Sequence, residues 1–213
     1  MTASAARDDM ALLSAWQAGD AHAGNQLFER HFDAIYRFFR YKTGDDGADL
    51  VQRTFLGCIE ARDRFRRASS FRTFLFAIAR NELRGYWRKR HKMANIDFGV
   101  SSLLDLGASP STMARKRDSA QQLVDALRSI PLEQQVALEL FYMHGLSGPE
   151  LAFVLEIPEG TVRSRLRQAR LSLREHLARA SSVRASGAPA PHEGPDWEQH
   201  LEGLLRAMYT MDT

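Results

Sequence analysis

Four arginines recur at helical spacing in the last third of the chain, where they could bind a polyanion. They are Arg163, Arg167, Arg170 and Arg174. Spacings of three and four residues return to one side of a helix, so these side chains form a basic stripe. An apolar stripe begins one residue earlier and would face the core, at Val162, Leu166, Ala169, Leu173 and Leu177. Taken alone, such a helix could equally be an ordinary solvated basic face.

The segment that precedes this helix favours DNA binding. Ser147 can cap a short helix, and Glu150 stands three residues later, as in a capping box. Pro158 ends that helix and Gly160 opens the next one. A short helix, a tight turn and a second helix form a helix-turn-helix, which places the start of its second helix in the major groove. The predicted DNA contacts there are Thr161, Arg163, Ser164, Arg165, Arg167 and Arg170.

A second basic region lies far from the helix-turn-helix. Between Arg62 and Lys92 there are eleven lysines and arginines and only two acidic residues, and aromatic residues are interleaved with them. This composition is typical of sites where rings stack on bases and cations hold phosphates. Phe71 also fits core spacing. Tyr86 and Trp87 stand beside the densest basic run, where we expect exposed rings near a helix end.

Nearly every segment has helical periodicity and none alternates as a strand, so the sequence predicts an all-α protein. Helices are expected near residues 9–18, 20–43, 46–65, 71–92, 118–129 and 131–144, before the helix-turn-helix. Residues 94–117 are rich in Gly, Ser and Pro and are expected to form a flexible linker. The chain would then contain two small helical domains, at residues 10–93 and 118–178.

The C-terminal part, residues 179–213, is expected to be a flexible tether followed by an amphipathic helix. One face of that helix would carry Trp197, Leu201, Leu204 and Met208, with Leu205 beside them. A free helix of about 15 residues is marginal in water, so this face should dock on a partner. We favour docking on the chain's own domains, where the helix would regulate. A regulator protein or a polymerase are the alternative partners.

Taken together, these motifs resemble the group IV sigma factors of bacterial RNA polymerase, the extracytoplasmic-function type of the sigma-70 family. The stretch from Asp49 to Leu56 is similar to region 2.2, the stretches 71–81 and 86–88 to regions 2.3 and 2.4, and the stretch 160–166 to region 4.2. The resemblance covers roughly residues 10–93 and 118–178. Phosphorylation of Thr54 is left open, since a phosphate would add negative charge to region 2.2.

The resemblance implies an initiation factor that directs core polymerase to specific promoters and assists DNA melting. It implies that region 4.2 reads the minus-35 element and that docking on the β′ clamp coiled coil uses Asp49, Gln52, Arg53 and Phe55. By the same resemblance, the melted minus-10 element would be captured by Phe71, Asn81, Arg84, Tyr86, Trp87, Arg88 and Arg90. The implied partners are core polymerase, through its β′ clamp and β flap, promoter DNA and an anti-sigma factor.

Composition excludes several other classes of function. The seven histidines are scattered with no ligand or nucleophile–base spacing, so we expect no enzyme, no metal and no cofactor. Cys58 stands alone and is expected in the core. No apolar run is long enough to insert into a membrane and no leader pattern is present, which indicates the cytoplasm. A stand-alone helix-turn-helix regulator is the alternative function, although it would not need the aromatic residues of the first domain.

Overall fold

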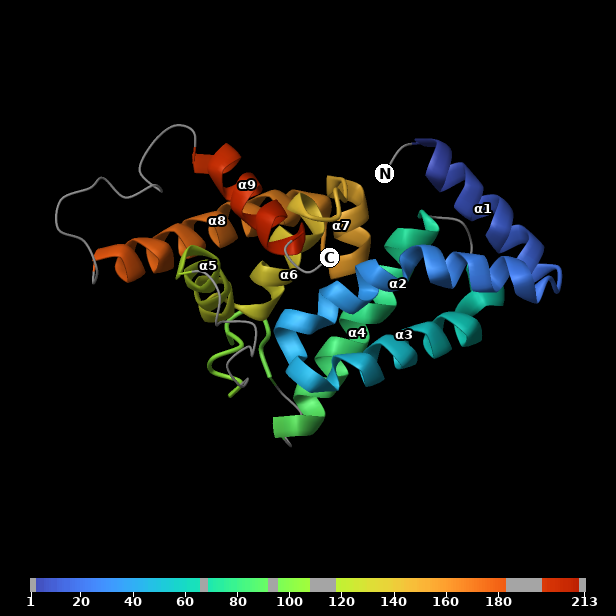
Figure 1. Cartoon of the computed structure of the whole chain (residues 1–213), viewed down its shortest axis with the longest axis horizontal. Coiled ribbons are helices and arrows are strands. Elements are labelled where there is room, and N and C mark those ends of the chain that lie inside the picture. Colours follow the sequence, from blue (N-terminus) through green and yellow to red (C-terminus); the bar gives the residue numbers. More distant parts are fainter. Residues whose placement is uncertain (1–2, 66–68, 92–95, 108–117, 183–196, 211–213) are drawn as a thin grey trace.

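The computed structural model describes residues 3–65, 69–91, 96–107, 118–182 and 197–210, and it shows two helical bodies side by side (Figure 1). The first body contains α1 (Ala3–Gln17), α2 (Ala21–Thr43), α3 (Gly47–Ala61) and α4 (Phe71–His91). The second contains α5 (Asp118–Ser129), α6 (Leu132–Tyr142), α7 (Gly148–Leu155), α8 (Glu159–Ser182) and α9 (Trp197–Thr210). Within the described ranges there is no strand beyond one isolated bridge between Ser102 and Pro131. The all-α prediction is confirmed.

Glycine and aspartate determine where the helices of the first body begin and end. Gly19, at a φ of 105°, lets the chain turn after α1, and the Asp20 side chain accepts hydrogen bonds from the first backbone N–H groups of α2. Short 3₁₀ turns at Gly44–Asp46 and Arg62–Arg64 flank α3. The core between these helices is apolar and includes Cys58, as expected.

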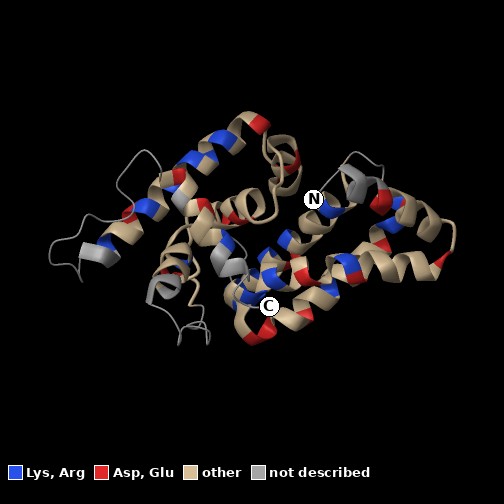
Figure 2. Cartoon of the chain, turned by 45° about the horizontal axis from the view of Figure 1, so that its top comes forward, with Lys and Arg blue, Asp and Glu red and all other residues tan. Residues whose placement is uncertain are grey.

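The second body holds the predicted helix-turn-helix, formed by α7 and α8. The capping box is present, because the backbone N–H of Ser147 donates to a Glu150 carboxylate oxygen at 2.9 Å. Glu156 ends α7 in the left-handed region at a φ of 55°, and the chain then turns into α8. The predicted apolar stripe of α8, at Val162, Leu166, Ala169, Leu173 and Leu177, is buried. Figure 2 shows basic residues repeated along this helix, and the sequence shows that all of them are arginines.

Residues 96–107 do not form the flexible linker that their composition predicts. Phe98, Leu103 and Leu106 are buried, and backbone hydrogen bonds join Ser101 to Leu132 at 3.0 Å and Phe98 to Glu133 at 3.1 Å. The expectation is wrong here because three apolar side chains find a place against the second body, which local composition does not reveal. The rest of the predicted linker, at 94–95 and 108–117, lies outside the described residues.

Helix α9 docks on the second body across α5 and α6 (Figure 1). Trp197, Leu201 and Leu205 are buried, whereas Leu204 is only half-buried. The buried face of α9 therefore consists of residues spaced four apart, and its third member is Leu205, where the sequence predicted Leu204. The Met208 side chain and the tether at 183–196 lie outside the described residues.

Candidate nucleic-acid and polymerase interfaces

The start of α8 presents an exposed polar and basic surface. Arg163, Ser164 and Arg167 are exposed and line a shallow depression beside Gly160, and Thr161 is exposed as well. The two other predicted contacts are already engaged. Arg165 forms an ion pair with Glu133 at 3.2 Å, and Arg170 forms one with Glu198 of α9 at 3.2 Å. Four of the six predicted minus-35 residues are thus free to meet DNA in this conformation.

The predicted minus-10 residues of α4 divide into an exposed group and a buried group. Asn81, Arg88 and Arg90 are exposed. Tyr86 is half-buried, and its hydroxyl donates to Asp46 at 2.7 Å. Burial and the Asp46 carboxylate raise the pKa of Tyr86 to about 12, so the phenol stays a neutral donor.

Trp87 and Phe71 are buried. The expectation of an exposed ring is wrong for Trp87, whereas Phe71 lies in the core, as its spacing allowed, and is not available to the minus-10 element in this conformation. Trp87 is 1% exposed and Phe71 is 0% exposed. The Trp87 ring packs edge-on to Tyr86, with centroids 5.0 Å apart, and stacks on His91. The physical reason is periodicity, because Phe76, Ala79, Leu83 and Trp87 follow one another at three, four and four residues and form the inner stripe of α4.

An apolar groove lies between α2 and α3, next to the residues predicted to bind polymerase. Its volume is about 630 Å³, and the exposed apolar side chains along it are Phe32, Tyr36, Leu56 and Ile59. Phe55 forms part of its floor, with its ring 4.7 Å from that of Phe28. Large apolar side chains gathered on one exposed face indicate a protein-binding surface.

Polar residues of α3 flank this groove. Gln52 is exposed and lines it, and Asp49 and Arg53 form an exposed ion pair at 2.7 Å. Thr54 points the other way: it is 0% exposed, and its hydroxyl donates to the Leu50 carbonyl at 2.8 Å. A kinase could not reach that hydroxyl without local unfolding of α3.

Comparisons with known proteins match both helical bodies to one family. Residues 27–93 match the family Sigma-70 region 2, and residues 120–173 match Sigma-70, region 4. The ECF RNA polymerase sigma-E factor of Escherichia coli strain K12 is 30% identical over 172 residues, which cover 76% of this chain and 90% of that protein. The sigma-E factor of Haemophilus influenzae is 29% identical over 174 residues, covering 76% and 91%.

This chain belongs to the ECF sigma factors. Two solved structures share its fold. The sigma factor RpoE from Bartonella quintana, in complex with the anti-sigma factor NepR, is 25% identical with a TM-score of 0.54, covering 72% of this chain and 96% of that one. CnrH, in complex with the cytosolic domain of CnrY, is 24% identical with a TM-score of 0.53, covering 84% and 99%. The protein is therefore an RNA polymerase sigma factor and not a stand-alone regulator.

In this sigma factor the region-2 helices pack directly against the region-4 helices. Helix α4 lies along α7 (Figure 1). Lys42 at the end of α2 forms a buried ion pair with Glu139 of α6, and Thr73 of α4 donates to Glu150 of the capping box at 2.8 Å. Arg72 donates to the backbone carbonyl and, at 3.1 Å, to the Nδ1 of His144. The two bodies thus meet through these polar side chains as well as through an apolar core that is continuous across both.

Sequence reasoning missed these interdomain residues. Glu133, Glu139 and His144 are 5%, 6% and 3% exposed, although acidic residues are rarely buried without a partner. Their partners lie 53 to 97 residues away along the chain, so no local pattern connects them. The one available signal was the position of Glu133 and Glu139 in a helix otherwise rich in apolar residues.

The described part of the sigma factor contains no feature of a metal site or a membrane span. Among those residues, no three His, Cys, Asp or Glu side chains gather closely enough to hold a metal ion. None of the described helices is long and apolar enough to cross a membrane.

Proposed function

We propose that the start of α8 reads the minus-35 element. The observation that carries this proposal is the exposed surface at Thr161, Arg163, Ser164 and Arg167, at the end of the helix that enters the major groove in a helix-turn-helix. Arginine at such a position can bond a guanine bidentately and discriminate between bases, whereas phosphate contacts only position the protein. Arg163 is therefore assigned to a base edge and Arg167 to a phosphate.

The test compares Arg163→Ala with Arg167→Ala in transcription by core polymerase from a promoter library randomised at the minus-35 element. Arg163→Ala should cost about 1–3 kcal/mol and relax the preference at one upstream base. Arg167→Ala should weaken all sequences alike and flatten the salt slope of binding by about one unit. An Arg163→Ala protein with unchanged upstream preference would contradict the assignment.

For the melted minus-10 element, we propose a surface on the outer side of α4. Asn81, Arg88 and Arg90 are exposed there, and Tyr86 offers part of its ring beside Arg90, whose guanidinium carbon lies 5.9 Å from the ring centroid. Cations next to an aromatic ring suit an unpaired strand, because its bases stack and its phosphates are anionic. Arg84 belongs to the same surface but is held by carboxylates in this conformation.

For core polymerase, we propose docking in the groove between α2 and α3. Its apolar wall suits an amphipathic helix, and the carboxylates of Glu29 and Asp33 along it favour cationic side chains on that helix. The β′ clamp coiled coil, expected from the family resemblance, has the helical form that such a groove accepts. On the same basis, the second body would contact the β flap, and an anti-sigma factor would hold the free protein.

These roles are all binding roles. We propose that the protein is a non-catalytic specificity subunit that leaves phosphodiester chemistry to the polymerase, and that it acts in the cytoplasm, where promoter DNA and polymerase are found. Helix α9 is proposed to regulate DNA binding, because Glu198 pairs with one of the recognition-helix arginines, Arg170.

A further inference from the structure

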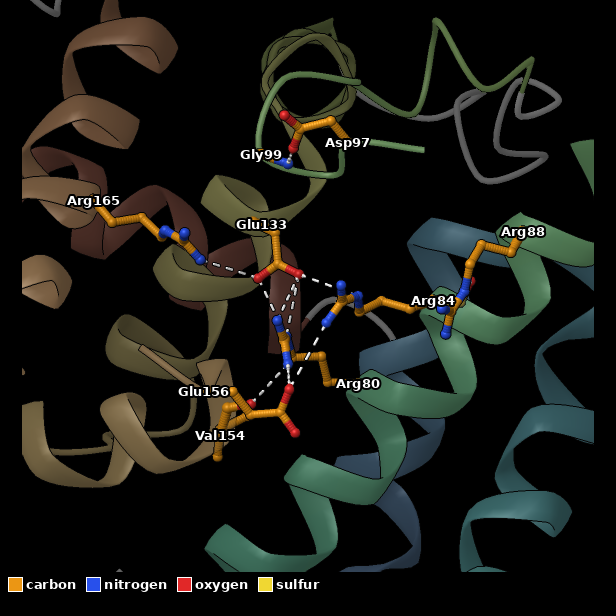
Figure 3. A network of polar contacts seen from close by, with 9 residues as sticks. All are labelled: Arg80, Arg84, Arg88, Asp97, Gly99, Glu133, Val154, Glu156 and Arg165. Atoms are coloured by element: carbon orange, nitrogen blue, oxygen red, sulfur yellow. Dashed lines mark hydrogen bonds and ion pairs between the residues drawn. The ribbon is translucent and has the colours of Figure 1, made fainter. Parts of the chain in front are cut away.

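One buried carboxylate, that of Glu133, gathers three arginines from both bodies (Figure 3). Arg80 of α4 reaches it at 2.9 Å and Arg84, one turn later, at 3.8 Å. Arg165 of α8 reaches its other oxygen at 3.2 Å. Glu156 adds a second carboxylate, 3.5 Å from Arg80 and 3.9 Å from Arg84. These five residues are called the Glu133 cluster below.

The chain holds Glu133 firmly in this place. Its backbone N–H donates to the Phe98 carbonyl at 3.1 Å, so the 96–107 segment anchors the start of α6. Arg80 is 4% exposed and also donates to the Val154 carbonyl at 3.2 Å. The Phe98 ring lies 5.5 Å from the Arg84 guanidinium carbon. The cluster is therefore held in place by specific contacts to the backbone and to the Phe98 ring, and is not a set of unconstrained surface charges.

The Glu133 cluster engages one proposed DNA contact from each body. Arg84 belongs to the minus-10 surface and Arg165 to the minus-35 helix. The Arg165 guanidinium donates to Glu133 at 3.2 Å and so has engaged a donor that it would offer to a phosphate, whereas Arg84 lies at ion-pair distance from both carboxylates, which offset its charge. Three arginines also face only two carboxylates, so the cluster keeps an excess positive charge that attracts a further anion.

We propose that Glu133 locks the sigma factor in a closed state that withholds Arg84 and Arg165 from promoter DNA, and that DNA phosphates compete with Glu133 for them. This inference rests on the proposed DNA contacts of these two arginines. The ion pairs themselves oppose opening little, because buried charges regain hydration when they separate, so the apolar core shared by the two bodies supplies the main cost of opening. The interdomain contacts at Lys42–Glu139 and Thr73–Glu150 are polar in the same way.

The closed state leaves the polymerase groove open. Phe32, Tyr36, Leu56 and Ile59 stay 40–50% exposed while the Glu133 cluster is formed. Core polymerase can therefore dock in the groove while the Glu133 cluster is formed. The free sigma factor would then bind little DNA of any sequence.

The test replaces Glu133 with its neutral isostere, Glu133→Gln, and measures the distance between the bodies by fluorescence energy transfer. Labels are placed on the exposed positions Glu60 and Gln168, each changed to Cys. The native Cys58 does not interfere, because burial raises the pKa of its thiol to about 12. Glu133→Gln should lower the transfer efficiency of the free protein to the value that core polymerase produces with the unmodified chain.

Binding of a random-sequence duplex to the unlabelled free protein is measured in parallel. Glu133→Gln should bind the duplex severalfold more tightly, with a salt slope steeper by roughly one unit for each arginine released. The matched control is Glu175→Gln, which removes one exposed negative charge from α8 outside the cluster. Transfer efficiency and duplex affinity equal to those of this control would overturn the proposal.

A second variant guards against misfolding. Arg80→Gln breaks the cluster from the other body and leaves Arg84, Glu133 and Arg165 in place. If circular dichroism shows that Glu133→Gln has lost helical content, the measurement on Arg80→Gln decides. A folded Arg80→Gln protein with unchanged transfer efficiency would overturn the proposed lock. This test is independent of the proposed minus-35 reading. The transfer efficiency is measured without DNA, and the Arg163→Ala experiment does not measure separation of the two bodies.

Discussion

At the scale of single residues, Trp87 shows how the core and the DNA surface share one helix. Its ring points inward while Arg88 and Arg90, one and three residues later, are exposed. The indole therefore supports the basic surface from below and cannot stack on a base without local unfolding. Its role is to position the exposed face of α4.

Trp87→Ala should lower the free energy of unfolding by about 3–5 kcal/mol, because it leaves a large cavity under α4. Urea denaturation followed by circular dichroism measures this change. Arg88→Ala, at the exposed neighbouring position, should change the free energy of unfolding by less than about 0.5 kcal/mol. A different result would contradict this role. If Trp87→Ala keeps full stability, fails to open duplex promoters and recovers activity on a pre-melted template, the Trp87 ring contacts DNA.

At the scale of elements, α9 closes a surface of the second body that would otherwise be open. Trp197, Leu201 and Leu205 fill it, and Leu205 lines a small cavity together with Tyr41 at the end of α2. Helix α9 therefore lies at the junction of the two bodies as well as beside the recognition helix. Its 14 residues are too few for a stable helix in water, so docking and folding should be coupled.

Leu201→Asp should release α9, because burying an unpaired charge costs several kcal/mol. The released helix should unfold, lose protection from proteases and free Arg170, and duplex DNA should then bind severalfold more tightly. Gln199→Asp is the matched control, since it adds the same charge at an exposed position of the same helix. A Leu201→Asp protein with weaker binding to core polymerase and unchanged DNA affinity would indicate a helix that contacts polymerase instead.

At the scale of the whole molecule, the contact between the two bodies contains a titratable group. His144 is buried, and its Nδ1 accepts a hydrogen bond from Arg72, which requires a ring without a proton at that atom. Burial lowers the pKa of His144 from its ordinary value of 6.5, and nearby Arg72 and Lys42 act in the same direction against Glu139. The closed state therefore favours the neutral ring.

The closed state should lose stability in mildly acidic solution. Once the bodies separate, His144 regains its ordinary pKa, so proton binding favours the open state. The contribution of the neutral His144 ring to the stability of the closed state is fully present above pH 6.5. It is lost as the pH falls from there through the lowered pKa of the closed state. Energy transfer between labels at positions 60 and 168 follows this change.

His144→Gln should remove this pH dependence, because glutamine can still accept from Arg72 but does not titrate. His22→Gln, at an exposed position, should keep it. Burial raises the pKa of Asp9, but His31 and Arg30 outweigh it and hold that pKa below 3.8. The stabilisation of the first body by ionised Asp9 is therefore present above pH 3.8 and is lost only in more acidic solution than the His144 effect. An unmodified protein with constant transfer efficiency between pH 7.5 and 5 would contradict the role of His144.

Much of this sigma factor is determined by local sequence. The arginine and apolar stripes of α8, the capping box at Ser147 and the helix stops at Gly19, Gly44 and Gly145 follow from residues three or four positions apart. Such patterns depend on helix geometry and backbone freedom alone, which is why they predicted the fold and the exposed start of the recognition helix, while the family followed from the resemblance of the motifs to sigma-70 regions 2 and 4.

Tertiary structure alone decided which of these side chains are available. The burial of Trp87, the packing of residues 96–107 and the choice of Leu205 over Leu204 depend on which surfaces meet, and composition does not encode that. The Glu133 cluster joins residues of α4, α6, α7 and α8 that are separated by up to 85 positions. Charges so far apart in the chain attract one another only after packing brings them together and removes the water between them, so the closed state follows from the fold and not from any motif.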